Sequence, residues 1–243
     1  MRDPAHFLFF GQRQGANAFV LGSDETRHAH QVLRAKQGSV VRTTDGSGAV
    51  FECCIERVDR DGAHLSVRSS SVGPVVAPRV RCLIGLPERD AFETAIENLA
   101  ALGVETIVPV ETALCQDPWW QDKWARYELR FTAKMVAGCK QSLNPRLPSL
   151  LPPQGLDEAL RESVGSVLVA QRDGRAAQEL LPGPSGGSPE PLTCLVGPPG
   201  GLSADELATL SSISAQFVRL GHHRLRTELA ATLLCGAVLA LVP

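Results

Sequence analysis

The stretch LVGPPGGLSADE, residues 195–206, decides the fold class predicted for this chain. It begins with the end of an apolar run, which predicts a buried strand. Ser203 and Glu206 have the spacing of a capping box, so a helix is expected directly after the loop. Three glycines within residues 197–201 permit a tight turn and let a ligand approach the main chain closely. The loop either forms the wall of a ligand pocket or is a tight turn without a ligand. It lacks the P-loop and G-x-G-x-x-G patterns, so neither of these nucleotide-binding motifs is present.

Residues 79–243 alternate between strand and helix patterns. The predicted strands are VRCLIGL, VETIVPV, SVLVAQ, LTCLVG and QFVRL, and the predicted helices are RDAFETAIENLAAL, Trp119–Lys140, LDEALRES, ADELATLSSI and Thr227–Leu241. This alternation predicts an α/β fold, a mostly parallel sheet with helices on both faces. Ligands of such folds bind beyond the carboxyl ends of the strands, so loops 197–202 and 220–228 are expected to form one pocket. For Trp119 and Trp120 we favour packing, at the helix start or at a dimer interface, over stacking on a base.

Residues 1–70 contain shorter, strand-like segments. These are HFLFF, AFVLG, SVVRTTDG, AVFECCIERV and AHLSVRSS, separated by Gly, Asp and Ser turns. One helix, DETRHAHQVLR, interrupts them, and Ser23 is its predicted N-cap. The segment predicts a small β-barrel domain with one helix. Residues 71–78, rich in Ser, Pro and Gly, are the predicted linker to a second domain, residues 79–243.

The composition indicates a soluble, cytoplasmic protein. Its 243 residues are 44% hydrophobic and 21% charged, which is typical of globular domains. Seven cysteines, an odd number without C-x-x-C spacing, indicate neither a disulfide framework nor a zinc site. The C-terminal apolar run LAATLLCGAVLALV is too short to span a bilayer. We therefore expect a buried helix there, and neither membrane association nor a metal.

Charge is distributed unevenly along the chain. Residues 1–81 contain eleven Lys and Arg against eight Asp and Glu, a net charge of +3, although the whole chain carries −2. A basic segment favours contact with a polyanion such as RNA. Arg34 and Lys36 have two possible interpretations: they contact RNA phosphates, or they belong to a solvated helix face. His28 and His30 do not share one helical face well, which argues against a metal site.

Three stretches, in the same order, resemble one known family. They are HAHQVLRAKQGSVVRTTDGSG (28–48), LVGPPGGLSADE (195–206) and LGHHRLRTELA (220–230). Together they are similar to the bacterial 16S ribosomal RNA uracil-N3 methyltransferases, which belong to the SPOUT class. The resemblance implies a PUA-like, RNA-binding first domain and a second domain tied in a trefoil knot. It also implies S-adenosylmethionine as cofactor, a homodimer, and N3 of a uridine in the 16S rRNA of the 30S subunit as target.

The same resemblance implies which residues form the site. The cofactor pocket would consist of Leu168, Val196, Gly197, Pro198, Gly200, Gly201, Leu202, Leu220, Gly221, Leu225, Arg226 and Thr227. RNA contacts would come from His30, Arg34, Lys36, Gln141 and Arg146. Arg226 would stabilise negative charge on the base or fix a phosphate, and Glu228 would orient Arg226 or accept the proton, directly or through water. The alternative for these two residues is an ion pair at the helix start without chemistry, and Thr227 is expected to N-cap the last helix.

The chain departs from the family's usual pattern at six positions: Asn98, Ala101, Lys140, Asn144, Pro199 and His223. Pro199 replaces a glutamate in the glycine loop, and His223 replaces an arginine. Lys140 and Asn144 stand where a glutamate and an arginine are usual. Three functions therefore remain open: the uridine methyltransferase, a knotted homodimer that binds RNA without methyl transfer, and a methyltransferase of the same fold with another base or ribose target.

Overall fold

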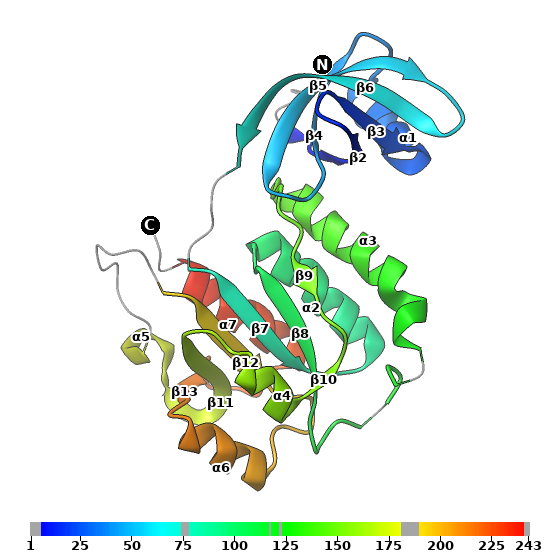
Figure 1. Cartoon of the computed structure of the whole chain (residues 1–243). Helices are drawn as coiled ribbons and strands as arrows, with labels where there is room; N and C mark the ends of the chain where they lie inside the picture. Colours follow the sequence, from blue (N-terminus) through cyan, green and yellow to red (C-terminus); the bar gives the residue numbers. More distant parts are fainter. Residues whose placement is uncertain (1–5, 74–77, 117, 122, 181–189, 241–243) are drawn as a thin grey trace. The chain divides into compact units, whose positions relative to one another are not determined.

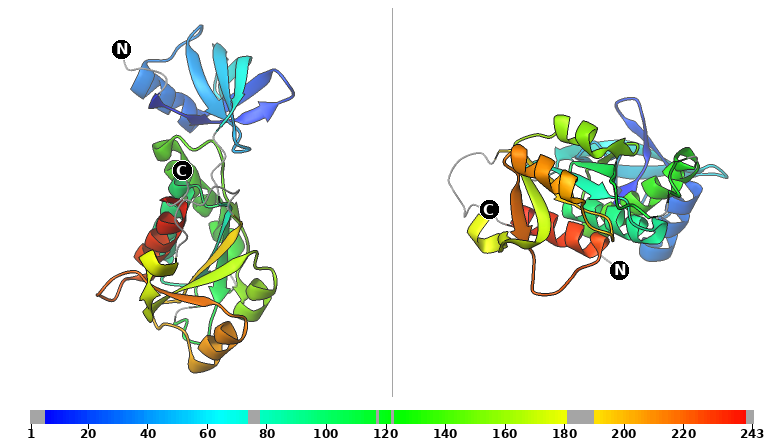
Figure 2. Two further views of the ribbon diagram at one scale, coloured as in Figure 1. Left: turned by 90° about the vertical axis from the view of Figure 1, so that its left-hand side faces the viewer. Right: turned by 90° about the horizontal axis from the view of Figure 1, so that it is seen from below.

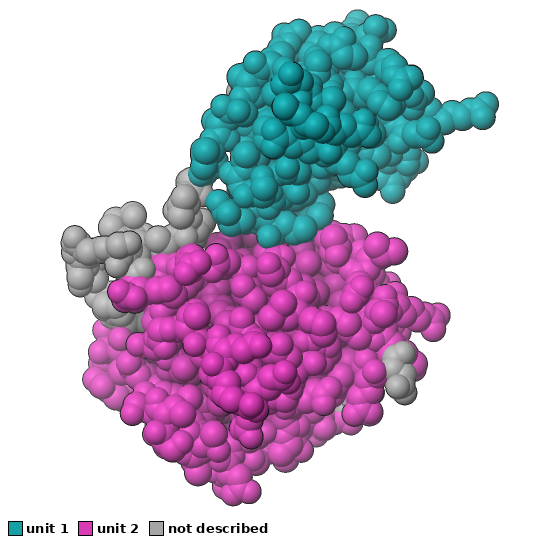
Figure 3. All heavy atoms as spheres, in the orientation of Figure 1, with its two compact units in different colours: residues 1–75, 136–147 teal, residues 76–135, 148–243 magenta. Residues whose placement is uncertain are grey.

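The computed structural model describes residues 6–73, 78–116, 118–121, 123–180 and 190–240 (Figure 1). The chain forms two compact units (Figure 3). The first consists of residues 1–75 and 136–147, and the second of residues 76–135 and 148–243. The segment 136–147, which the predicted boundaries place in the second domain, thus belongs to the first unit. Residues 74–77 of the predicted linker lie outside the described residues.

The first unit contains a six-stranded mixed sheet and one helix. Its strands are β1 (Phe9–Phe10), β2 (Gln12–Gln14), β3 (Ala18–Gly22), β4 (Val40–Thr44), β5 (Ala49–Val58) and β6 (Gly62–Val72), in the order β1-β4-β5-β6-β3-β2, and its helix is α1 (Ser23–Leu33). The β1–β4 pair is parallel and the other pairs are antiparallel. Two register shifts between β5 and β6 bend the sheet, because a bulge increases the local twist.

Apolar side chains from the strands and from α1 form the core of this unit. Phe9, Phe19 and Phe51 are buried there, and the rings of Phe19 and Phe51 lie 4.9 Å apart. Ala29 of α1 is buried against the same core, with Val32 beside it. The inner face of α1 is therefore apolar, and its polar residues lie on the opposite face.

The second unit contains a parallel sheet. Its strands are β7 (Val80–Gly85), β8 (Thr106–Glu111), β9 (Ser149–Leu150), β10 (Gln154–Gly155), β11 (Ser166–Ala176), β12 (Leu192–Val196) and β13 (Gln216–Arg219). The order is β10-β8-β7-β12-β11-β13, with β9 also paired to β8. All these pairs are parallel. The helices are α2 (Arg89–Leu102), α3 (Trp124–Ser142), α4 (Leu156–Arg161), α5 (Ala177–Leu180), α6 (Ala204–Ser212) and α7 (Thr227–Ala240), of which α3 ends in the first unit.

Helices cover both faces of this sheet (Figure 2). α2 and α7 pack on each other, and α7 also packs on β7 and β12. On the other face, Leu156 of α4 and Leu210 of α6 belong to a buried cluster with Leu83 and Leu195 of the strands. The predicted α/β architecture is confirmed, whereas the trefoil knot stays a prediction from the resemblance. Within the described residues, no helix combines the length and apolarity needed to cross a membrane.

Two helix starts differ from the predictions. Gly22, not Ser23, is the N-cap of α1, and it caps the helix without a side-chain hydrogen bond. The predicted helix Trp119–Lys140 begins only at Trp124, because the two preceding tryptophans lie in a turn. The indole N–H of Trp119 donates to the carbonyl of Pro87 at 2.9 Å, and that of Trp120 donates to the Glu111 carboxylate at 2.6 Å. Trp120 is buried, so the packing interpretation is confirmed for it.

The last turn of α3 contributes Lys140 to the first unit. Its ammonium forms an ion pair with Glu25 of α1 and donates to Nδ1 of His28 at 3.1 Å. The ring of His28 packs edge-on against Phe9. Burial and the adjacent Lys140 lower the pKa of His28 below its ordinary value, against a smaller opposing effect of Glu25. The folded chain thus favours the neutral imidazole.

From this pKa shift we expect the stability of the first unit to fall in acid. Because the pKa of His28 is lower in the folded than in the unfolded chain, its contribution to stability is complete above about pH 6.5 and is lost as pH falls through the folded-state pKa. His28→Asn removes the titrating imidazole. As the pH falls from about 7 to about 5, a range that begins just above the ordinary histidine pKa, we expect the unfolding free energy of this variant to decrease less than that of the parent protein. Urea unfolding of both proteins across this range measures the difference. A difference that does not change with pH would contradict the assignment to His28.

Candidate functional site

The loop of residues 197–203 lies at the carboxyl edge of the second unit's sheet. It follows β12, and its first residues lie directly on the end of the neighbouring strand β7. A Cβ atom at Gly85 would be 2.5 Å from both N and Cδ of Pro198, which is well inside van der Waals contact. Pro198 is buried in this position. The absence of a side chain at Gly85 therefore permits the loop to lie here.

The loop that follows β8 packs against the same segment. A Cβ atom at Gly200 would be 2.7 Å from the carbonyl oxygen of Leu114. Glu206 joins the two loops, because one of its carboxylate oxygens accepts the N–H of Ser203 at 2.7 Å and the other accepts the N–H of Ala113 at 2.8 Å. The predicted capping box is confirmed, and it also holds the β8 loop.

The loop that follows β13 supplies two further contacts. The guanidinium of Arg224 donates to the carbonyl of Pro199, and the hydroxyl of Thr227 donates to the carbonyl of Gly197 at 3.1 Å. The first hydrogen bond of α7 is accepted by the carbonyl of Arg226. The predicted N-cap role of Thr227 is therefore wrong, because its hydroxyl is used as a donor to the glycine loop. Three loops from separate strand ends are thus joined by hydrogen bonds to main-chain groups, two of them to carbonyl oxygens and one from the N–H of Ala113.

The three glycines of the loop have different roles. Gly201 alone among them has a positive φ, at 83°, and a Cβ atom there would meet nothing within 4 Å. Gly197 and Gly200 are instead crowded by Leu202 and Leu114. A side chain at Gly201 would therefore point into open space, whereas the other two glycines are required by protein packing.

Arg226 and Glu228 lie beside this loop cluster, at the start of α7. Arg226 is exposed and Glu228 is half-buried. Within the part of the chain that the structure describes, neither side chain forms a hydrogen bond or an ion pair. The two residues do not pair with each other, so a guanidinium and a carboxylate are both available to a ligand. Such groups can stabilise negative charge and accept a proton, respectively.

The other predicted cofactor residues divide into two groups. Val196, Gly197, Pro198, Gly200, Gly201 and Leu202 lie in or next to the β12 loop, and Leu220, Gly221 and Leu225 lie in the β13 loop. Leu168 is separate, because it is buried inside the sheet on β11, paired with Cys194 and Gln216. The structure thus brings the two loops together and leaves Leu168 in the core below them.

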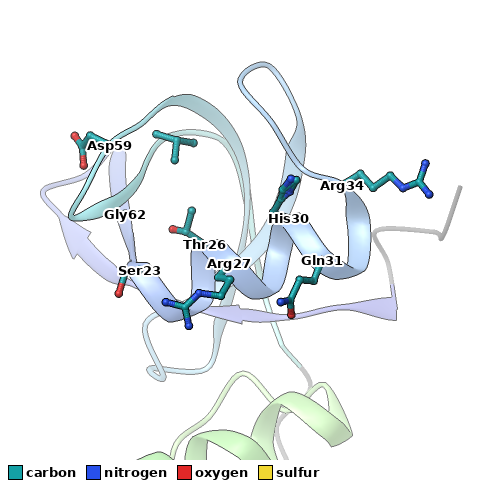
Figure 4. Close-up of a pocket in the computed structure, with 9 residues that line it drawn as sticks. Ser23, Thr26, Arg27, His30, Gln31, Arg34, Asp59 and Gly62 are labelled. Atoms are coloured by element: carbon teal, nitrogen blue, oxygen red, sulfur yellow. The ribbon is translucent and has the colours of Figure 1, made fainter.

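A hollow of about 690 Å³ in the first unit contains two of the predicted RNA contacts (Figure 4). Its lining consists of Ser23, Thr26, Arg27, His30, Gln31, Arg34, Val58, Asp59 and Gly62. A second hollow of about 360 Å³ shares Thr26, His30 and Val58 with it and adds Lys36. His30, Arg34 and Lys36 are therefore neighbours along one groove. Gln141 is exposed near the end of α3, and Arg146 donates to the carbonyl of Ser47 at 3.3 Å, so both lie outside the groove lining.

Sequence reasoning missed several residues that the structure brings to these sites. Gly85 had a signal, since a glycine ends the strand pattern VRCLIG. The sequence identifies Glu206 as part of a capping box, but no sequence pattern indicates its hydrogen bond to the N–H of Ala113. Arg224 had no signal either, because its partner is a main-chain oxygen 25 residues away. The described residues contain no group of three His, Cys, Asp or Glu side chains that could hold a metal ion.

Two family models of RNA methyltransferases match this chain. The family model described as "RNA methyltransferase domain" matches residues 76–239, and the one described as "RNA methyltransferase PUA domain" matches residues 21–68. The ribosomal RNA small subunit methyltransferase E of Mycobacterium tuberculosis is 32% identical over 230 residues, which cover 92% of this chain and 86% of the relative.

Solved structures show the same fold. The "putative methyltransferase" of Legionella pneumophila, in complex with the bound cofactor SAM, is 23% identical with a TM-score of 0.81, and the match covers 97% of each chain. The ribosomal RNA small subunit methyltransferase E of Neisseria gonorrhoeae, bound to S-adenosyl methionine, is 20% identical with a TM-score of 0.80 over 97% of this chain and 98% of that one. The family matches and the sequence identity to the mycobacterial relative agree with the resemblance of the three motifs. The chain therefore belongs to the ribosomal RNA small subunit methyltransferase E family.

Proposed function

We propose that this chain transfers a methyl group from S-adenosylmethionine to N3 of a uridine in the 16S rRNA of the small ribosomal subunit, in the cytoplasm. The observation that carries the proposal is the open space beside the main chain at Gly201, in the loop that Thr227 holds, together with Arg226 and Glu228, whose side chains have no partner among the described residues. These residues occupy the edge of a parallel sheet at which α/β proteins bind their ligands. They do so in a chain of the methyltransferase family.

The residues at this edge fit S-adenosylmethionine. Gly201 leaves room for an adenosyl group against the backbone, and Leu220 and Leu225 are half-buried apolar side chains on the adjoining loop. Thr227 and Arg224 fix two carbonyl groups of the glycine loop, so the loop does not need to become ordered when the cofactor binds. The bound cofactor supplies an electrophilic methyl group.

The remaining chemistry belongs to the uracil base. N3 of uracil carries a proton at neutral pH, so the base must lose this proton as N3 becomes a nucleophile. The Glu228 carboxylate can accept it, directly or through water. Arg226 can stabilise the negative charge that spreads over the uracil oxygens, since a guanidinium keeps its charge and presents several donors in one plane. Holding the base and the methyl group in line is the other contribution of the site.

Four departures from the family pattern have structural partners in this chain. Lys140 pairs with Glu25, and the Asn144 side chain accepts the N–H of Arg146 at 3.0 Å. Asn98 donates to the hydroxyl of Thr232 on α7 at 3.3 Å. Pro199 contributes its carbonyl, which accepts from Arg224. These contacts account for the changed residues without removing a group from the proposed chemistry, which favours the methyltransferase over a binding protein without activity.

Arg226→Ala tests the proposed chemistry. We expect the parent protein to methylate N3 of uridine in unmodified 30S subunits, and the variant to be slower by about 100-fold or more, the usual cost of removing a donor that stabilises developing charge. Its melting temperature should not change, because the side chain is exposed and has no partner within the described residues. Labelled methyl transfer with mass analysis of the nucleosides measures the outcome. Arg126→Ala, an exposed arginine on α3, is the matched control.

The outcomes of this assay separate the alternatives. Methyl on another position of the base or on ribose would change the target. If the parent protein binds S-adenosylmethionine but incorporates no methyl group into the RNA, the result would contradict the methyltransferase proposal and favour a protein that binds RNA without methyl transfer. Normal turnover of Arg226→Ala would remove Arg226 from the mechanism.

Gly85→Ala tests the position of the glycine loop. The added methyl group would lie 2.5 Å from Pro198, so the loop must move away from β7. We expect the affinity for S-adenosylmethionine to fall by about 10-fold or more, consistent with the usual cost of overpacking. Gly155→Ala is the matched control, since its Cβ would meet nothing within 4 Å. Isothermal titration calorimetry measures both affinities, and equal affinities would show that the loop does not hold the cofactor.

We further propose that the chain forms a homodimer through α7. Leu229 and Leu233 are 46% and 42% exposed, which is unusual for leucines in a helix that is otherwise apolar. Their spacing of four residues places them on one face. They follow Arg226 and Glu228 directly in the chain, so a partner on this face would lie near the proposed active site.

Paired substitutions test the dimer. We expect Leu229→Glu with Leu233→Glu to give a monomer, because two carboxylates would have to be buried at the interface. Leu129→Glu changes a leucine of α3 that is 86% exposed, and it should leave the dimer intact. Sedimentation equilibrium gives the mass of each species. A dimer that survives the double substitution would place the interface elsewhere.

A further inference from the structure

The loop that follows β8 begins with a tight turn that carries an exposed leucine. The N–H of Cys115 donates to the carbonyl of Thr112 at 3.1 Å, so Ala113 and Leu114 are the two central residues of a β-turn. Turns favour glycine, proline, asparagine, aspartate and serine, which suit their backbone geometry and their contact with water. Leu114 is instead a large apolar residue, and it is 41% exposed. The geometry of the turn therefore does not explain the choice of this residue.

Two contacts hold this turn against the glycine loop. The N–H of Ala113 donates to the carboxylate of Glu206 at 2.8 Å. At the next residue, the main chains of the two loops touch, because a Cβ atom at Gly200 would lie 2.7 Å from the carbonyl oxygen and 2.9 Å from the Cβ atom of Leu114. The backbone of Leu114 is thus fixed beside the glycine loop, while much of its side chain stays in contact with solvent.

The far end of the same loop is anchored as well. The indole N–H of Trp119 donates to the carbonyl of Pro87, just after β7, at 2.9 Å. The indole N–H of Trp120 donates to the carboxylate of Glu111, the last residue of β8, at 2.6 Å. The ring centroids of Trp119 and Phe92 lie 5.9 Å apart, so this end of the loop also packs on α2. Because both ends are held, the turn does not have to be ordered when a ligand binds.

The place of Leu114 in the sheet distinguishes it from the other exposed apolar residues of the second unit. Among the described residues of this unit, the other large apolar side chains that are exposed are Leu129, Val164, Ile213, Leu229 and Leu233. Val164 and Ile213 precede β11 and β13, so they lie at the amino edge of the parallel sheet. The remaining three are on helices, two of them on the α7 face proposed for the dimer. Leu114 alone of this set lies in a loop at the carboxyl edge, where ligands of such sheets bind.

We propose that Leu114 is a cofactor-binding residue whose side chain covers the adenosyl group of S-adenosylmethionine beside Gly201. Gly201 follows Gly200 directly in the chain, and a Cβ atom at Gly201 would meet nothing within 4 Å. An adenosyl group in that space would meet the apolar side chain that the β8 turn holds next to Gly200. The contact would remove apolar surface of both groups from water, which stabilises the complex. The inference rests on the proposed function, because it specifies how the same site holds its cofactor.

Leu114→Ala tests this contact in the full-length protein. Alanine keeps the carbonyl oxygen and the Cβ atom that face Gly200, so the substitution removes only the outer part of the side chain. We expect the affinity for S-adenosylmethionine and for S-adenosylhomocysteine to fall by about 10-fold or more, as for the loss of several buried carbon atoms. The heat-capacity change of binding should become less negative, because less apolar surface is buried. Isothermal titration calorimetry at several temperatures measures both quantities.

Two further variants separate the apolar contact from an effect on the fold. Leu114→Met keeps an apolar side chain of similar volume, so its affinities should stay within about 3-fold of the parent values. Ile213→Ala is the matched control, because Ile213 is 46% exposed but lies at the opposite edge of the sheet, and it should change neither the affinity nor the heat-capacity change. Without cofactor, Leu114→Ala should melt close to the parent protein, since its side chain is only partly buried.

Equal cofactor affinity of Leu114→Ala and the parent protein would overturn the inference, and so would an equal loss in Leu114→Met. A higher KM for 30S subunits with unchanged cofactor affinity would also overturn it, because Leu114 would then contact the RNA. Methyl transfer to 30S subunits separates this result from the proposed function. Transfer by the parent protein without any effect of Leu114→Ala on affinity would leave the function standing and reject the role of Leu114. A loss of affinity in this variant, in a parent protein that transfers no methyl group, would do the reverse, and a parent protein that binds no cofactor would reject both.

Discussion

The close approach of Pro198 to the backbone at Gly85 is the contact on which the proposed active site depends. It places the glycine loop directly on the end of β7, and this position brings Gly200 against Leu114 and the carbonyls of the loop within reach of Arg224 and Thr227. The loop is thus held by its main chain. A change of side chain within it, such as proline at position 199, leaves that arrangement intact because the carbonyl is the group in use.

Some polar side chains of the second unit hold its loops together, and others are available for the proposed reaction. The carboxylate of Glu206 and the hydroxyl of Thr227 are both used to join loops, as expected of polar groups near a packed surface. Arg226 and Glu228, on either side of Thr227 in the chain, have no side-chain partner within the described residues. Loops that hydrogen bonds hold together, with two oppositely charged side chains at the start of α7 that have no partner among the described residues, are suited to a reaction in which charge develops on the substrate, because the loops need little reorganisation.

In the first unit, α1 has a different role on each side. Ala29 packs in the core, Glu25 and His28 contact Lys140, and Arg27 and His30 line the first hollow. This separation follows from the helical repeat of 3.6 residues, which sends neighbouring side chains in different directions. The contact with Lys140 comes from a segment far along the chain, so the first unit is complete only when residues 136–147 have folded onto it.

The sequence by itself determined the class of the fold, the capping box at Ser203 and the family. These depend on local patterns: the alternation of strands and helices, the spacing of a cap, and motifs in a fixed order. It also placed His30, Arg34 and Lys36 together, because one helix and its end carry them. Only the tertiary structure decided that Gly197 and Gly200 serve packing, that Thr227 binds the glycine loop instead of capping α7, and that residues 136–147 belong to the first unit. Each of these depends on contacts between segments that are distant in the chain, and no local pattern records which main-chain oxygen or neighbouring strand a side chain will meet.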